Sequence, residues 1–182
     1  MLRWKRMSEL TIDRALRLLP GVTLERPGVK HIVPAMNAKV GATAGWVITA
    51  GTNISHATLP ASQTGSTLVV PITGLNVGDV VTAVSAVGQV ESAGGNVTCT
   101  MSVRKLSAAA VADLTDAEIG TDNVGTLTAD TLLTDANGNL RASGLNETMG
   151  ADEQLYALFT ATTAAATDID LSHLVVTVTK KR

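Results

Sequence analysis

Apolar and small polar residues alternate through three runs in the middle of the chain, and this pattern constrains the fold more than any other feature. The runs are Thr67–Ile72, Val80–Val87 and Val97–Val103. A period of two with β-branched residues is typical of strands with one buried face. Gly74–Asp79 and Gly94–Asn96 separate the runs, and Gly and Asn allow the positive φ angles that tight turns require. Several strands at short spacing, with no helix pattern between them, predict a mainly β fold: an antiparallel, jelly-roll-like β-sandwich.

The strand pattern continues on both sides of this region. Further strands are expected near Lys30–Val33, Val124–Leu133, Leu140–Leu145, Leu155–Ala161 and Leu174–Thr179. Residues 107–119 mix helix-forming alanines with turn-forming Asp and Thr, so we expect an irregular connection there.

The length of 182 residues suits one compact domain with an extension. Aromatic residues make up 2% of the chain, so Val, Leu, Ile, Ala and Thr must fill the core. Trp46 begins a predicted strand and is expected to be buried. Tyr156 and Phe159 are an odd number of positions apart on one predicted strand, so they should face opposite sides of the sheet. The single Cys99 excludes an intramolecular disulfide and, lying within an alternating run, is predicted to be buried.

Charge divides the chain into a basic part and an acidic part. Residues 1–39 hold eight basic and three acidic side chains, whereas residues 40–182 hold six basic and thirteen acidic ones. We therefore predict an N-terminal arm over residues 1–39 and a β-sandwich domain over residues 40–182. A basic arm on an acidic body suggests contact with an acidic partner surface, and solvated charge on a tail is the alternative.

The arm contains one predicted helix, over residues 8–19. Its apolar positions form a broad stripe that needs a partner surface, on its own domain, on a neighbouring subunit or on another protein. Pro20 and Gly21 end the helix. The residues predicted to bind a partner are Leu10, Arg14, Leu16, Arg17 and Leu19.

The start of the chain shows neither a membrane span nor a secretory signal. No run reaches the roughly 18 apolar residues that a membrane span needs. The basic start lacks an uninterrupted apolar segment, so it does not read as a secretory signal. Met7 is a possible alternative start.

No motif in the sequence names a reaction. His31, His56 and His173 lie in an arm, a loop and a strand edge, without partners at metal-ligand spacing. No serine lies in a Gly-x-Ser-x-Gly elbow, and no glycine-rich loop opens onto a helix. We therefore expect no catalytic residues, no cofactor and no metal, although a His–Asp pair formed in space stays an alternative.

Three weaker alternatives concern ligands. Asp135–Asn139 offers oxygen ligands for Ca²⁺, but Asn137–Gly138 between apolar runs is more typical of a hairpin turn. The basic arm suits nucleic acid only poorly, because Trp4 is its single aromatic residue and no nucleic-acid-binding signature accompanies it. A carbohydrate platform has few aromatic side chains available for stacking.

Two stretches resemble small β-sandwich structural proteins from the virions of tailed bacteriophages. One runs from Ala61 to Ile72 and continues through Gly74–Asp79, and the other runs from Ala151 to Thr163. The likeness lies in strand-and-turn style over about residues 40–179. It implies a capsid decoration (cement) protein, a head-fibre base or a tail-fibre module, often trimeric and without catalytic residues.

These observations together predict a non-enzymatic virion structural protein, most simply a capsid decoration protein anchored by its arm. The resemblance implies the major capsid protein or other virion subunits as partners, a homotrimer, and a place in the virion after assembly in the host cytoplasm. The alternative is a carbohydrate- or receptor-binding module of a phage head or tail fibre, which exposed aromatic side chains or a polar pocket would favour. A His–Asp–Ser cluster would favour an enzyme.

Overall fold

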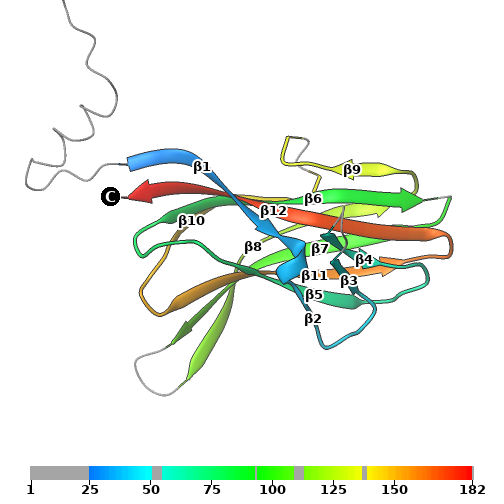
Figure 1. The fold of residues 1–182 in the computed structure, drawn as a ribbon, viewed down its shortest axis with the longest axis horizontal. Coiled ribbons are helices and arrows are strands. Elements are labelled where there is room, and N and C mark those ends of the chain that lie inside the picture. Colours follow the sequence, from blue (N-terminus) through cyan, green and yellow to red (C-terminus); the bar gives the residue numbers. More distant parts are fainter. Residues whose placement is uncertain (1–24, 51–54, 93, 109–112, 137–138, 182) are drawn as a thin grey trace, which may run out of the picture.

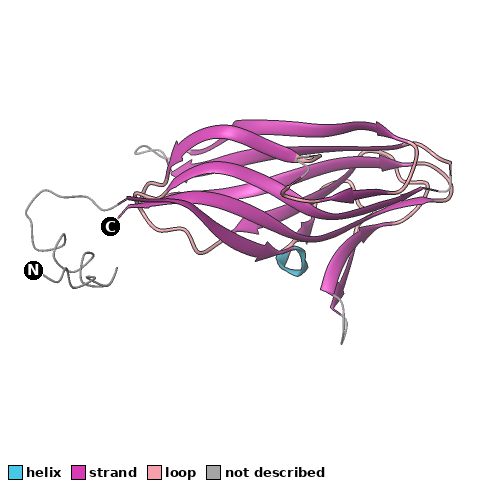
Figure 2. Ribbon diagram, turned by 90° about the horizontal axis from the view of Figure 1, so that it is seen from above, coloured by secondary structure: helices cyan, strands magenta, loops and turns pink. Residues whose placement is uncertain are grey.

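The computed structural model describes residues 25–50, 55–92, 94–108, 113–136 and 139–181, and these residues form two antiparallel β-sheets packed face to face (Figures 1 and 2). The sandwich is elongated, and its strands run roughly along the long axis (Figure 2). The chain passes repeatedly from one sheet to the other, as in a jelly roll. The predicted antiparallel β-sandwich is therefore confirmed.

Seven described strands form the larger sheet, sheet A: β1 (Glu25–Pro34), β3 (Val47–Ala50), β4 (Ser55–Leu59), β6 (Val80–Ser92), β9 (Thr131–Leu133), β10 (Arg141–Thr148) and β12 (Thr167–Lys181). Five form sheet B: β2 (Lys39–Val40), β5 (Ser66–Ile72), β7 (Val97–Ala108), β8 (Leu114–Leu127) and β11 (Glu153–Thr163). A short 3-10 helix, η1 (Ala35–Asn37), follows β1.

Strand β12 is the centre of sheet A. It pairs with β6 along nearly its whole length on one side, and with β4 and β1 in succession on the other. The register with β6 shifts between Leu171 and His173. This irregularity divides β12 into a first half beside β4 and a second half beside β1.

The inward side chains of both sheets meet in one hydrophobic core. Phe159 is fully buried at its centre, while Tyr156 on the same strand points to the outer face of sheet B, as the odd spacing predicted. Trp46 and Cys99 are also buried, as expected. Burial raises the pKa of the Cys99 thiol to about 12, so this cysteine is a core residue and not a reactive thiol.

The sandwich begins earlier than residue 40. Strand β1 pairs with β12 from Glu25 to Pro34, and Val33, Ala35 and Ala38 are buried in the core. The predicted boundary between residues 39 and 40 therefore comes too late, because this segment is basic but places its apolar residues in the core. The predicted helix over residues 8–19, with Leu10, Arg14, Leu16, Arg17 and Leu19, lies outside the described residues.

The expected irregular connection over residues 107–119 is wrong. Strand β7 continues to Ala108 and β8 begins at Leu114, and the two form a hairpin that extends away from the body (Figure 1). Cross-strand pairing explains the difference, since the Oγ of Ser107 and the Oγ1 of Thr115 are hydrogen-bonded at 2.7 Å. Pairing with β7 overrides the local turn preference of Asp and Thr.

Candidate functional site

A polar surface lies on the outer face of sheet A, where β3, β4, β12, β6 and β9 run side by side. One row of paired residues crosses all five strands: Val47, Thr58, Asp170, Gln89 and Leu132. Cross-strand partners share one face of a sheet. That face points outward, because the residues flanking Asp170 along β12 are buried in the core.

Three hollows open on this face, and the two larger ones form the site described below. The larger has a volume of about 450 Å³ and is lined by Thr58, Pro60, Ala61, Glu91, Ser92, Asp130, Ala166, Thr167 and Asp168. The smaller, of about 240 Å³, is lined by His56, Gly88, Gln89, Asp170 and Ser172. Thr58 Oγ1 donates a hydrogen bond of 2.5 Å to Asp170 Oδ1 and so joins the two linings. We call both hollows together the polar groove.

Local sequence shapes the floor of the groove. Asp168 and Asp170 alternate with the buried Ile169 and Leu171, which places both carboxylates on the outer face of β12. Gly88 lets β6 and β12 approach closely, since a Cβ there would lie 1.9 Å from the carbonyl oxygen of Asp170. No other residue type fits this position without a shift of the backbone.

The other half of the outer face is occupied by the segment after β9. Asp135 accepts a hydrogen bond from Ser85 Oγ on β6 at 2.7 Å and pairs with Lys30 on β1. The ammonium of Lys30 and the hydroxyl of Ser85 lower the pKa of Asp135. Its oxygens are therefore engaged by protein groups, which argues against calcium at the Asp135–Asn139 stretch; Asn137 and Gly138 lie outside the described residues.

The groove carboxylates accept few hydrogen bonds from the protein. Gln89 Nε2 donates to Glu91 Oε1 at 2.5 Å, and the backbone N–H of Ser92 donates to Asp130 Oδ1 at 2.8 Å. Asp168 Oδ1 is buried and has no hydrogen-bond partner. Burial, followed by the charges of Asp170 and Asp130, raises the pKa of Asp168.

No arginine or lysine within the described ranges lies within 4.0 Å of Glu91, Asp130, Asp168 or Asp170. The nearest basic group is the imidazole of His56, whose Nε2 is 3.6 Å from Asp170 Oδ1. The groove is therefore rich in hydrogen-bond acceptors, and no lysine or arginine of the described residues compensates its negative charge.

His56, Asp170 and Ser172 line the same hollow, but they do not form a nucleophile–base pair. Ser172 Oγ is hydrogen-bonded to Nδ1 of its neighbour His173 at 3.1 Å. Nδ1 of His56 is buried without a partner, and its Nε2 faces Asp170. The imidazole within hydrogen-bond reach of Ser172 is therefore that of His173, and His56 does not act as the base that a nucleophilic serine needs.

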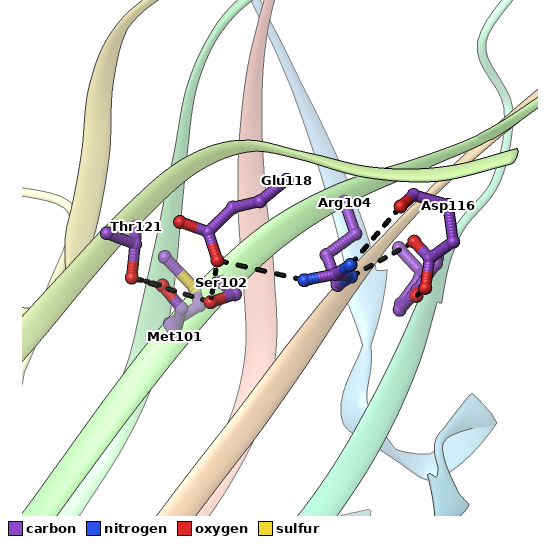
Figure 3. A network of polar contacts seen from close by, with 7 residues as sticks. Met101, Ser102, Arg104, Asp116, Glu118 and Thr121 are labelled. Carbon is purple, nitrogen blue, oxygen red and sulfur yellow. Dashed lines mark hydrogen bonds and ion pairs between the residues drawn. The ribbon is translucent and has the colours of Figure 1, made fainter.

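A second polar cluster, on the outer face of sheet B, is satisfied internally (Figure 3). Arg104 Nε donates to Asp116 Oδ1 at 3.0 Å, and Tyr156 Oη donates to Asp116 Oδ2 at 2.7 Å. Ser102 Oγ donates to Glu118 Oε2 at 2.8 Å. Hydrogen bonds from Tyr156 and Arg104 lower the pKa of Asp116. Because its donors and acceptors already have partners, this cluster links β7, β8 and β11 and offers a ligand little.

The described part of the chain contains no group of three or more His, Cys, Asp or Glu side chains that could hold a metal ion. It also contains no helix long and apolar enough to cross a membrane.

Sequence reasoning missed the polar groove. The alternation of Asp168 and Asp170 with buried residues was a usable signal for two carboxylates on one face. The contributions of Thr58, Gln89 and Glu91 depend on β4 and β6 flanking β12, and no local pattern gives that pairing.

The chain matches no protein-family model and no curated protein. Among solved structures, it is similar to a xylan-binding domain from CBM 22, with a TM-score of 0.47, 7% identity, and coverage of 83% of this chain and 95% of that one. It is also similar to the CBM22-2 xylan-binding domain from Paenibacillus barcinonensis Xyn10C (TM-score 0.45, 12% identity, 81% and 98% covered). A third is the xylan-binding module CBM15 (TM-score 0.35, 12% identity, 86% and 95% covered). What this chain shares with these carbohydrate-binding modules is a broad likeness of β-sandwich architecture.

Proposed function

We propose that this protein is a non-catalytic β-sandwich that binds a carbohydrate chain in the polar groove. The observation that carries the proposal is the set of incompletely satisfied acceptors on a rigid sheet, with Asp168 Oδ1 buried and unpartnered among them. Sugar hydroxyls are donors that such acceptors can take, and sites on paired strands hold their side chains in place more firmly than sites on loops.

The row of paired residues across the groove suits a sugar, which has both apolar C–H groups and polar hydroxyl groups. Its two ends are the exposed apolar residues Leu132 and Val47, which are 64% and 54% accessible. The polar residues Gln89, Asp170 and Thr58 lie between them. Five neighbouring strands span about 19 Å, so the row offers apolar contact at its ends and hydrogen bonds along its middle.

Stacking on an aromatic ring is not part of the proposal. The aromatic residues within the described ranges are Trp46, Tyr156 and Phe159, and none of them lines the groove. Binding then depends on hydrogen bonds that compete with water, which give small net energies each. We expect weak binding to a short oligosaccharide.

The test is calorimetric titration of the full chain with a panel of neutral and charged oligosaccharides. Asp170→Ala should abolish binding, because it removes the carboxylate that lines the smaller hollow and accepts the hydrogen bond from Thr58 of the larger one. Glu118→Gln is the control, since it changes a carboxylate on the opposite sheet. A panel in which no oligosaccharide binds, or in which Asp170→Ala binds as well as the wild type, would overturn the proposal.

A second candidate function is the virion structural role, with a capsid protein as partner and trimeric assembly. The β7–β8 hairpin favours it, because the first five residues of β8 are all exposed and Leu114 is 71% accessible. An ordered hairpin that projects from the body offers a neighbouring subunit an edge and two faces. Sedimentation of the purified chain tests self-association, and co-purification with intact particles tests the partner. A folded monomer that is absent from particles would count against this candidate.

A further inference from the structure

The polar groove gathers carboxylates that have no cation partner. Several carboxylates elsewhere on the described surface meet cations, as in the pairs Asp79–Lys180 and Asp135–Lys30 and the contacts of Lys105 with Glu147 and Glu153. In the groove, Glu91, Asp130, Asp168 and Asp170 have no lysine or arginine partner among the described residues. Four acidic groups therefore face one hollowed surface, and His56 is the one basic side chain of the described residues that lies within 4.0 Å of them.

Asp168 is the groove carboxylate with the least compensation from the protein. Its Oδ1 is buried without a hydrogen-bond partner, so the cost of removing this oxygen from water is not offset by the protein. Asp130 and Asp168 line the same hollow, and the charges of Asp130 and Asp170 both act on Asp168. A positively charged donor placed there would satisfy the free oxygen and relieve the repulsion at once.

The floor of the groove restricts how a ligand can be held. Strand β12 is paired with β6 and β4, β4 also pairs with β3, and β6 also pairs with β9. Strands β12, β4 and β6 are therefore paired on both sides in the middle of the floor, and an extended peptide cannot add beside them as a further strand. Recognition must come from side chains, which suits a ligand that carries donors around its own surface.

We infer that the carbohydrate bound in the polar groove is a chain of amino sugars carrying protonated amines. An ammonium group brings three donors, no acceptor and a positive charge, and its hydrogen bonds to carboxylates are charge-assisted. The ring hydroxyls of the same sugar reach Thr58 and Gln89, and the ends of the row supply apolar contact. This inference rests on the proposed function and specifies that the bound carbohydrate is positively charged.

The experiment compares glucosamine, N-acetylglucosamine and xylose hexamers, titrated calorimetrically into the full chain. Acetylation converts the amine to an uncharged amide and leaves the hydroxyl groups of the sugar unchanged. The glucosamine hexamer should bind about tenfold tighter than the acetylated one, as one or two partly exposed ion pairs provide. Raising the ionic strength from about 0.1 M to about 1 M should remove most of this advantage.

Variants locate the effect within the groove. Asp168→Asn should reduce the affinity for the glucosamine hexamer about tenfold and leave the affinity for the acetylated hexamer nearly unchanged. Asp152→Asn is the matched control, because it removes the same charge from an exposed position outside the groove. Glu91→Gln is a second groove variant, for use if circular dichroism shows that Asp168→Asn is not folded.

The outcomes separate this inference from the proposed function. Equal affinity for the charged and acetylated hexamers, or selective binding of the xylose hexamer, would overturn the inference that the ligand carries amines. The proposal that the groove binds a carbohydrate would still stand. Binding of none of the hexamers or other glycans would overturn both. A synthetic peptide of the basic residues 1–24 that displaces the glucosamine hexamer at lower concentration would also overturn the inference, because the groove would then serve the chain itself.

Discussion

Lys180 Nζ lies 2.5 Å from Asp79 Oδ2, and the two residues form a nearly buried ion pair between β12 and the turn before β6. Asp79 is 1% accessible, and its Oδ2 also accepts the backbone N–H of Asn76 at 2.7 Å. The pair therefore fixes the β5–β6 turn against β12.

Lys180→Met should destabilise the protein by about 3 kcal/mol, because it leaves Asp79 charged, buried and without a cation. Chemical denaturation with urea measures the loss. Lys181→Met is the control: its partner Glu25 is exposed and 3.7 Å away, so a change below about 1 kcal/mol is expected. Equal losses in both variants would contradict a special role for the buried pair.

The same pair predicts a loss of stability in acid. Burial alone would raise the pKa of Asp79, but hydrogen bonds from Lys180 and Asn76, with the charges of Lys180 and His31, outweigh it and lower the pKa. A carboxyl with a lowered folded-state pKa contributes stability above its unfolded pKa of about 3.9 and loses it as pH falls through the folded value. The stability difference between wild type and Lys180→Met should therefore be constant near neutrality and shrink below about pH 4. A difference that stays constant down to pH 2 would exclude this linkage.

Asp168 should behave in the opposite way. Burial and the charges of Asp170 and Asp130 raise its pKa, so the stability it contributes is present below its unfolded pKa and lost as pH rises through the folded one. Asp168→Asn should then stabilise the protein at pH 7 by up to about 1 kcal/mol while weakening ligand binding, as expected of a residue kept for binding. Thermal melts at pH 7 check this. A lower melting temperature for Asp168→Asn at pH 7 would show that the carboxylate stabilises the fold.

Gly88→Ala should cost about 3 kcal/mol and distort the polar groove, because the new Cβ would meet the backbone oxygen of Asp170 at 1.9 Å. Gly120→Ala is the matched control. Its Cβ would lie 2.5 Å from Leu145 Cδ2, the end of a flexible side chain that can move, so a smaller loss of about 1 kcal/mol is expected. Urea denaturation compares the two, and equal losses would mean that the β6–β12 approach is not specially tight.

Truncation tests where the sandwich begins. A chain starting at Glu25 keeps every described strand, so its melting temperature should change little. A chain starting at residue 40 lacks β1 with its buried Val33, as well as Ala35 and Ala38. It should melt more than about 10 °C lower. Similar melting temperatures for the two truncations would show that β1 adds little to the sandwich.

The sequence predicted the fold where one face of a strand is buried. Alternation over Thr67–Ile72 and Val97–Val103 marks strands whose inward residues fill the core, and the odd spacing of Tyr156 and Phe159 gave their opposite faces correctly. The first part of β8 was missed because it is exposed on both faces, whereas its end falls within the strand expected over Val124–Leu133. A strand without a buried face has no alternation to detect.

The groove was beyond sequence reasoning for a different reason. Asp170 and Gln89 are neighbours because β12 pairs with β6, and Thr58 joins them because β4 pairs with β12. Asp170 lies 81 positions from Gln89 and 112 positions from Thr58 along the chain, and the register of both contacts depends on the whole sheet. Local patterns gave the faces of the strands, and the tertiary pairing brought the carboxylates together.

The central place of β12 also has a consequence for folding kinetics. Strands β1, β4 and β6 are all synthesised well before β12. Glu25 can pair with Lys181 only after nearly the whole chain has been made. Loops that long close slowly, and sheets dominated by such distant pairings fold over milliseconds to seconds. Until β12 pairs with them, the edges of β4 and β6 that it will occupy stay unpaired. The nascent chain therefore depends on the slow pairing of β12 to cover these strand edges.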